Sequence, residues 1–195
     1  NILGIFVLML EEKVVLVDLH DQQLGTMGKL EAHEKAVLHR AFSIFVLNSN
    51  KELLLQQRAF GKYHSPGLWT NTCCSHQREG ESNLEAGNRR MIEEMGMTVS
   101  LQELFTFVYK AYFDNGLTEH ELDHVMVGYS NEDPKINTDE VESFKWMSLE
   151  ALKKDLVKNP EDYTVWFAII FDRLPRYGFM KSSCLLYTSP SPRDR

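Results

Sequence analysis

The sequence predicts an α+β fold, an α/β/α sandwich in which helices flank a mixed β-sheet. Short apolar runs rich in β-branched and aromatic residues alternate along the chain with longer runs of helical periodicity. No linker rich in Gly, Ser or Pro and no internal repeat divides the 195 residues, a length that suits one well-packed domain. We therefore expect a single domain over residues 9–181.

Six segments have the composition of β-strands, because each is rich in β-branched or aromatic side chains. They are Val14–Asp18, Ala41–Leu47, Leu53–Gln57, Leu104–Tyr109, Asp123–Tyr129 and Glu142–Met147. The polar run NSNKE joins the second segment to the third and predicts a β-hairpin between them.

Three segments have the periodicity of amphipathic helices: Ser82–Met95, Leu149–Lys158 and Glu161–Leu174. Ser148 stands directly before the second of them, and its hydroxyl is expected to cap that helix.

The charge balance restricts the partners of the chain. Its formal net charge is −7 and its sequence pI is about 5.5, whereas nucleic acids and anionic membranes bind concentrated basic surfaces. We expect neither a nucleic-acid nor a membrane partner, although a few well-placed cations could still hold a small anion.

The cysteines indicate a reducing compartment. The chain has three of them, and the adjacent pair Cys73-Cys74 cannot easily close into a disulfide with itself. The apolar opening NILGIFVLML is too short to span a bilayer and lacks the features of a signal peptide. A cytoplasmic protein is the expectation.

Both ends of the sequence differ in character from the rest. An ordinary first strand could begin just after Met9, so residues 1–8 are expected to be a non-native leader. Residues 182–195 show no hydrophobic periodicity and are rich in Ser, Pro and Arg. They are expected to form a disordered or artefactual tail that includes Cys184.

Histidines and glutamates from three short stretches suggest a metal site. They are His33, His39, His76, Glu119 and Glu121. The two glutamates stand two apart at the expected entry to a strand, where their carboxylates would share a face and would need a cation or a proton between them. Imidazole and carboxylate ligands without thiolate favour Zn²⁺ or Mn²⁺. The alternative is that these residues are ordinary polar side chains, since no single short motif unites them.

The run GESNLEAGNRRMIEEMG resembles the Nudix helix, whose carboxylates hold Mg²⁺ near a diphosphate. Arg89, Glu93, Glu94 and Gly96 fit the end of that pattern, and Glu81 fits its upstream acid. Arg90 occupies the position of a central catalytic glutamate, and Ser75 that of the leading glycine. Such a helix can ligate one Mg²⁺ but is poorly equipped for hydrolysis. A solvated amphipathic helix with surface charge pairs is the alternative.

Four basic residues near these motifs are candidate contacts for an anionic substrate: Lys29, Arg58, Lys62 and Arg90. A diphosphate would need several such charges, whereas each residue singly could equally be a solvated surface cation.

Taken together, the motifs resemble the type 1 isopentenyl-diphosphate Δ-isomerases, which are Nudix-fold enzymes that are not hydrolases. The resemblance runs from about Val14 to about Arg173. It rests on an ordered series of motifs: GTMGKLEAH, LHRAFSIFVLN, LLLQQR, PGLWTNTCCSH, the Nudix-like helix, YKA, EHE and a late YTVW.

The resemblance implies roles for individual residues. Cys74 and Glu121 correspond to the two catalytic acid/base groups, Trp166 to the tryptophan over the reacting carbons, and Tyr109 to the supporting tyrosine of the YKA motif. The five histidines and glutamates named above correspond to ligands of a divalent metal, Mn²⁺ or Zn²⁺. Glu94 and the backbone carbonyl of Cys74 correspond to the site of a Mg²⁺ bound with the substrate diphosphate. Lys29, Arg58, Lys62 and Arg90 correspond to diphosphate contacts.

The implied reaction converts isopentenyl diphosphate to dimethylallyl diphosphate in isoprenoid biosynthesis. A proton is added to one carbon of the double bond and another is removed across the resulting tertiary carbocation, which requires acid/base groups on opposite faces. The face of the Trp166 ring can stabilise such a cation by about 2 kcal/mol when it is desolvated. The sequence leaves open which group donates the proton, which metal is native and which oligomer forms.

Two departures from the family pattern fall near the site. Gln77 stands where the family often has proline, and Val165 replaces the proline of a late TPW. Two other functions therefore remain alternatives: a Nudix diphosphohydrolase, and a non-catalytic module that binds metal or diphosphate.

Overall fold

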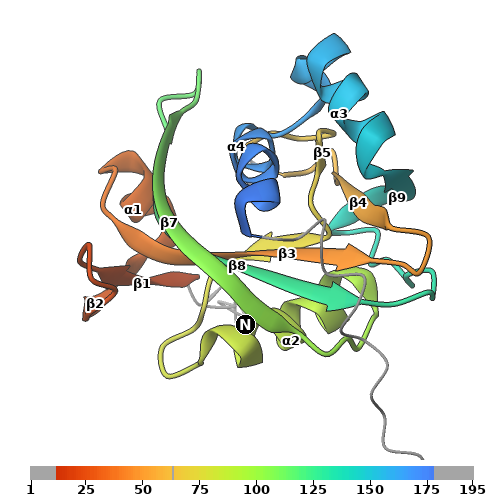
Figure 1. The fold of residues 1–195 in the computed structure, drawn as a ribbon. Helices are drawn as coiled ribbons and strands as arrows, with labels where there is room; N and C mark the ends of the chain where they lie inside the picture. Colours follow the sequence, from red (N-terminus) through yellow and green to blue (C-terminus); the bar gives the residue numbers. More distant parts are fainter. Residues whose placement is uncertain (1–11, 63, 178–195) are drawn as a thin grey trace, which may run out of the picture.

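A nine-stranded mixed sheet organises the chain, with helices on both of its faces (Figure 1). The structure is a computed structural model that describes residues 12–62 and 64–177. The expectations for residues 1–8, for residues 182–195 and for Cys184 lie outside the described residues. The predicted α+β sandwich is confirmed, because helices flank a mixed sheet.

The strands are β1 (Lys13–Val17), β2 (Gln23–Gly28), β3 (His39–Leu47), β4 (Glu52–Arg58), β5 (Trp69–Thr70), β6 (Cys73–Ser75), β7 (Gln102–Tyr112), β8 (Thr118–Tyr129) and β9 (Val141–Ser148). The helices are α1 (Lys29–Glu34), α2 (Asn83–Met95), α3 (Leu149–Lys158) and α4 (Val165–Arg173), with 3₁₀ turns at Pro160–Asp162 and Leu174–Tyr177.

Strand β3 is the centre of the sheet and brings the main sequence motifs together. It runs parallel to β8, with His39 opposite Glu121 at one end of the pairing. On its other side it runs antiparallel to β6, with Ser43 opposite Cys74. The EHE motif and the cysteine motif therefore lie on strands on opposite sides of β3.

The alternation of side chains along the strands produces two separate cores. On one face, β3 contributes Phe45 and Leu47 to a cluster with α3 and α4. On the other face, Ile44 and Val46 join a cluster with α2. This period of two is what half-buried strands require, and it explains why α2 covers one face of the sheet while α3 and α4 cover the other (Figure 1).

Helix α2 begins and ends with strong local signals. Ser82 accepts a hydrogen bond from the backbone of Glu85, whose side chain accepts one from Ser82 in return, a complete capping box. Gly96 ends the helix in the left-handed conformation at φ 61°. The connection between β8 and β9 packs against this end of the helix, and the backbone N–H of Asn137 donates to the carbonyl of Glu94. These contacts fix the end of α2 that carries Glu94.

Replacing Gly96 by alanine is expected to destabilise the fold. A left-handed alanine costs about 1–2 kcal/mol, and a Cβ at Gly96 would also overlap the carbonyl oxygen of Lys135, which adds about 1–3 kcal/mol. Gly116 is the control, because its φ is also positive at 84° but a Cβ there meets nothing within 4 Å. Chemical denaturation should show a clearly larger loss for Gly96→Ala than for Gly116→Ala. Equal losses would mean that the contact with Lys135 contributes nothing.

Most predicted elements lie within a few residues of the observed ones, and Ser148 caps α3 as expected. The helix predicted over Glu161–Leu174 is wrong at its start, since α4 begins only at Val165. Tyr163 instead bridges to Trp69, and Thr164 donates its backbone N–H to the carbonyl of Trp69. Pairing with β5 therefore overrides the helical periodicity of these residues.

Candidate active site

A cavity of about 630 Å³, including its open mouth, lies between β3, β4, β6, β8, α2 and α4. Its charged lining consists of four cations and four carboxylates among the described residues: Lys29, Arg58, Lys62, Arg90, Glu94, Glu119, Glu121 and Glu140. Its other lining includes Cys74, Ser75, His64, His76, Tyr109 and Trp166. Both signs of charge and a thiol therefore face one space.

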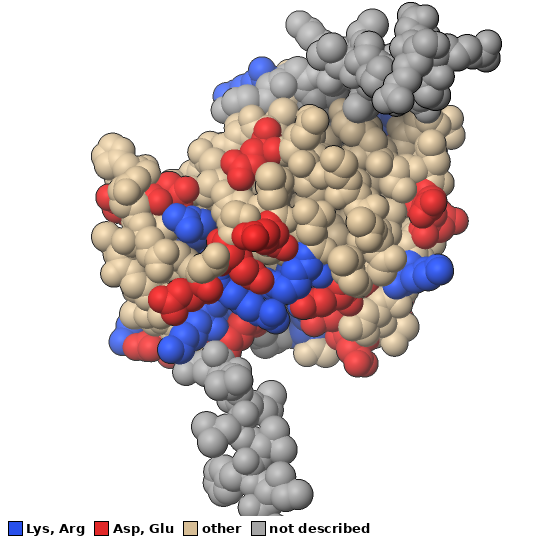
Figure 2. All heavy atoms as spheres, turned by 90° about the horizontal axis from the view of Figure 1, so that it is seen from below, with Lys and Arg blue, Asp and Glu red and all other residues tan. Residues whose placement is uncertain are grey.

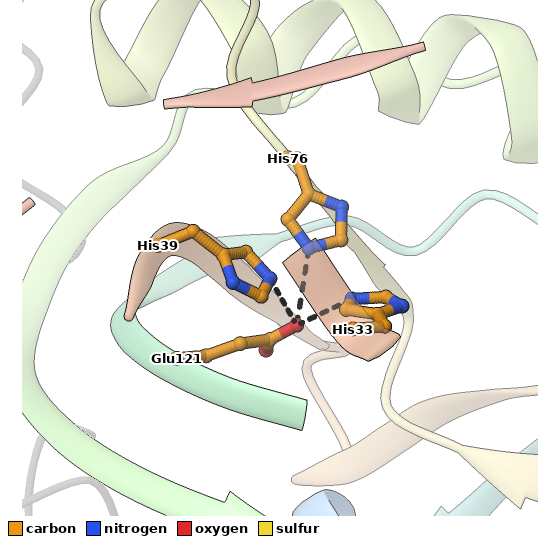
Figure 3. A group of neighbouring side chains, drawn as sticks. All are labelled: His33, His39, His76 and Glu121. Atoms are coloured by element: carbon orange, nitrogen blue, oxygen red, sulfur yellow. Dashed lines mark hydrogen bonds and ion pairs between the residues drawn. The ribbon is translucent and has the colours of Figure 1, made fainter. Parts of the chain in front are cut away.

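Three imidazoles converge on one carboxylate at the edge of this cavity (Figure 3). Oε1 of Glu121 lies 3.0 Å from Nε2 of His76, 3.4 Å from Nε2 of His39 and 4.0 Å from Nε2 of His33. The four residues are buried, and their potential ligand atoms all lie within 4.8 Å of one another. They come from α1, β3, the end of β6 and β8, which the sheet register brings together.

This group has the donor chemistry of a divalent metal site. Nδ1 of His39 lies 2.8 Å from the carbonyl oxygen of Val37, so Nδ1 is a donor there and Nε2 is the atom that faces Glu121. That Nε2 atom is buried and has no hydrogen-bond partner among the described residues. Burial, with the neighbouring His76 and His39, lowers the pKa of His33 to about 3. Three imidazoles and a carboxylate have the donor atoms that suit a divalent cation such as Zn²⁺ or Mn²⁺.

Glu119 lies beside this group but faces different partners. Its Oε1 atom is 3.7 Å from Nε2 of His64, and its Oε2 atom is 2.9 Å from the hydroxyl of Tyr109. The same hydroxyl is 2.6 Å from Oε2 of Glu121. Tyr109 therefore bridges the two glutamates of the EHE motif, and Glu119 reaches the four-residue group through it.

The two glutamates have opposite pKa shifts. Burial, and then the neighbouring Glu121, raise the pKa of Glu119 well above its usual value. Burial alone would also raise the pKa of Glu121, but the imidazoles of His39 and His76 outweigh it and hold that pKa well below the usual value. These opposite shifts favour a protonated Glu119 beside an ionised Glu121, so that only one of the two neighbouring carboxyls is charged.

Cys73 and Cys74 point to opposite faces of β6. The side chain of Cys73 is fully buried in the core beneath α2. Cys74 packs against the opposite cluster, which contains Tyr109 and Trp166, and lines the cavity. Burial raises the pKa of Cys74 to about 12, so this side chain is a neutral thiol near pH 7. Both cysteines are free.

Trp166 closes the cavity from the start of α4. The residue is 3% exposed, and the guanidinium of Arg58 lies 5.2 Å from the centroid of its ring. Arg58 also donates to the backbone carbonyls of Ser65 and His64 at 3.1 Å each. One cation therefore fixes both the aromatic wall and the loop opposite it.

The Nudix-like helix directs its last turn at the cavity. Arg90 donates to Glu94 through Nε at 3.1 Å, and Nε2 of Gln56 donates to the other oxygen of Glu94 at 3.0 Å. Arg89 turns away from the cavity and pairs with Glu81 at 2.7 Å and with Glu93 at 3.2 Å. Glu93 and Glu94 are therefore held by arginines, and of the two only Glu94 lines the cavity.

Comparisons with known proteins agree with this geometry. The NUDIX domain family matches residues 37–167. An isopentenyl-diphosphate Delta-isomerase of Pectobacterium atrosepticum is 49% identical over 165 residues, which are 85% of this chain and 92% of that protein. The isopentenyl-diphosphate Delta-isomerase 2 of Aromatoleum aromaticum is also 49% identical, over 85% of this chain and 87% of that protein.

The chain belongs to the isopentenyl-diphosphate Delta-isomerase family.

Solved structures support the fold. The Deinococcus radiodurans protein DR0079 superposes with a TM-score of 0.70 at 20% identity, covering 83% of this chain and 98% of that one. A MutT protein from Methanosarcina mazei Go1 superposes with a TM-score of 0.59 at 23% identity, covering 71% of this chain and 94% of that one. The predicted Nudix-like sheet and the predicted isomerase family are both confirmed.

The structure brings all the predicted site residues of this isomerase family member to one region. His33 and His39 contact Glu121, and the other predicted residues line the cavity itself: Lys29, Arg58, Lys62, Cys74, His76, Arg90, Glu94, Tyr109, Glu119, Glu121 and Trp166. Lys29 is anchored by Glu12, with 3.0 Å between Nζ and Oε2. The roles of these residues remain predictions.

Two titratable residues of the cavity lining, His64 and Glu140, were not predicted from the sequence. His64 lies between Glu119 and Trp166, with its ring 5.8 Å from that of Trp166 and nearly perpendicular to it. The sequence signal for His64 was its place two residues after Lys62, a predicted substrate contact. Glu140 precedes β9 and contacts Lys62 and Arg90. No sequence motif connects it to them.

The surface and the helices bear on possible partners. On the face shown in Figure 2, acidic and basic side chains are interspersed, and no broad patch of one sign covers that face. Within the described part of the chain, no helix is both long and apolar enough to cross a membrane.

Proposed function

We propose that the protein converts isopentenyl diphosphate to dimethylallyl diphosphate, the isomerisation after which its relatives are named. The observation that carries the proposal is the single cavity lined by Cys74, by Glu121 and by four cations. The four cations suit the diphosphate, and the thiol and carboxyl suit the proton transfers.

Two proton transfers make up the reaction. A proton is added to the terminal alkene carbon, which becomes a methyl group and leaves a tertiary carbocation on its neighbour. A second proton is then removed from the methylene carbon on the other side of the cation, which lies between the cationic carbon and the carbon that bears the diphosphate oxygen. The electron pair of that C–H bond forms the new double bond to the cationic carbon. Cys74 and Glu121 are the proposed groups, since they project from the two strands on either side of β3.

The wall of the cavity protects the cation. The ring of Trp166 offers its π-electrons, and a desolvated cation–π contact contributes about 2 kcal/mol. Tyr109 holds Glu121 in place through its hydroxyl. Because Trp166 is almost completely buried, it also excludes water that would trap the carbocation as an alcohol.

Divalent metals complete the proposed site. His33, His39, His76 and Glu121 would hold Mn²⁺ or Zn²⁺, with Glu119 supporting that group through Tyr109. Glu94 and the backbone carbonyl of Cys74 would hold Mg²⁺ beside the diphosphate. When bound, these ions supply positive charge that stabilises nearby carboxylates and phosphate oxygens. Two free cysteines suit a reducing compartment, and we place the enzyme in the cytoplasm. Its substrate is a small molecule, not a nucleic acid or a membrane.

Incubation with isopentenyl diphosphate and Mg²⁺ should yield dimethylallyl diphosphate. In D₂O the new methyl group should carry deuterium, because its third hydrogen comes from an exchangeable acid. A protein that instead released phosphate or a nucleoside monophosphate from nucleotides would be a Nudix hydrolase. Metal binding without turnover of any isoprenoid diphosphate would indicate a non-catalytic module.

A further inference from the structure

Glu140 is an acidic residue in the part of the cavity proposed to receive a diphosphate. It stands directly before β9 and lines the cavity together with Lys62 and Arg90. An unopposed carboxylate would repel an anionic substrate, so its presence here needs a physical reason.

The backbone holds Glu140 firmly in this place. Its carbonyl accepts the N–H of Ala59 at 3.1 Å, which ties it to the end of β4. Its own N–H donates to the carbonyl of Asn137 at 3.0 Å, and the N–H of Asn137 donates to Glu94 at the end of α2. Glu140 is therefore held beside the turn that carries Lys62 and, through Asn137, beside the end of α2, the helix that carries Arg90.

Its side chain joins the two cations. Oε2 of Glu140 contacts Nζ of Lys62 and lies 3.5 Å from a guanidinium nitrogen of Arg90. All three side chains are mostly shielded, with exposures of 27% for Glu140, 24% for Lys62 and 15% for Arg90. A phosphate group that binds Lys62 and Arg90 must come close to this carboxylate.

The structure points to Glu140 as a specificity-determining residue, and we infer that it makes the cavity select a diphosphate bound to a divalent cation over the bare anion. The inference rests on the proposed function, which assigns Lys62 and Arg90 to the diphosphate. Glu140 neutralises part of their charge and repels an unaccompanied phosphate. A cation carried in with the diphosphate offsets that repulsion, so the complex with metal is favoured.

Binding of inorganic pyrophosphate tests this inference without depending on turnover. Protein whose His/Glu group is loaded with Mn²⁺ or Zn²⁺ is titrated calorimetrically with pyrophosphate, once with and once without added Mg²⁺. The Mg²⁺ preference is the ratio of the two dissociation constants for pyrophosphate. For Glu140→Gln we expect metal-free pyrophosphate to bind about 10- to 100-fold more tightly than in the unmodified protein. Binding with Mg²⁺ should change far less, so the preference for Mg²⁺ should fall.

Glu93→Gln is the matched control. Glu93 also pairs with Arg90, at 2.8 Å, but it is not among the residues that line the cavity. The same loss of one charge should therefore leave the Mg²⁺ preference unchanged, and thermal unfolding should show both variants folded.

The possible outcomes distinguish the inference about Glu140 from the proposed diphosphate site. If Glu140→Gln leaves the preference unchanged, or weakens the binding of metal-free pyrophosphate, the inference is overturned, since Glu140 would then serve only to hold Lys62 and Arg90. If the unmodified protein binds no pyrophosphate even with Mg²⁺, the diphosphate site of the proposed function fails as well.

Discussion

Replacing Cys74 by alanine is expected to lower the turnover of isopentenyl diphosphate by about 10²–10⁴-fold, the usual contribution of a positioned acid or base. The cavity lining offers this thiol, and burial, which raises its pKa to about 12, keeps the proton on sulfur. Alanine carries no exchangeable proton. The loss should appear in kcat, measured by product formation, while the Kd for inorganic pyrophosphate with Mg²⁺ stays close to that of the unmodified protein.

The neighbouring cysteine provides the control for this experiment. Cys73→Ala removes a sulfur of the same kind one residue away, but from the core beneath α2. It should therefore lower the free energy of unfolding, by about 1 kcal/mol, and leave most of the turnover in place. Full activity in Cys74→Ala would exclude the proposed role, and equal losses in the two variants would point to damage of β6.

The contrast between the cysteines shows what a sequence can predict. A period of two along a strand sends adjacent residues to opposite faces, so one of the pair had to face the core once β6 was a strand. The sequence did not mark residues 73–75 as a strand, because three residues are too few for a pattern. Their conformation comes from pairing with β3.

The elements that the sequence did not predict are short or depend on pairing with another strand. Strand β2 (QLGTMG) contains two glycines and becomes a strand through its pairing with β1. Helix α1 spans only six residues, too short for periodicity to reveal. The longer strands and α2 carry their own patterns and caps, and these were predicted to within a few residues.

The site was predictable to the extent that its residues lie in recognisable motifs. The order of these motifs along the chain indicated the family, and the register of β3 with β8 then places His39 opposite Glu121. Glu140 and His64 act through contacts with residues distant in sequence or on other elements. A single sequence holds no local signal for such contacts.

Replacing Glu121 by glutamine is expected to weaken divalent-metal binding by more than about 100-fold, beyond the loss typical of an outer-shell partner. Glu121 is the carboxylate on which all three imidazoles converge, and a neutral amide attracts a cation far less. Turnover should also fall, by about 10²–10⁴-fold, because an amide cannot serve as an acid or base. Metal affinity is measured by competition with a chelator, independently of the isomerase assay.

Glu119→Gln is the informative comparison, since it makes the same change two residues away on the same face of β8. The carboxyl of Glu119 faces His64 and reaches the imidazole group through Tyr109, so its loss should weaken metal binding less, by about 10–100-fold. Both substitutions remove one potential negative charge, so the expected difference in metal affinity comes from where the two carboxyls lie. Equal losses of affinity would show that Glu119 ligates the metal as directly as Glu121. A larger loss for Glu119→Gln would contradict the central place that the geometry gives to Glu121.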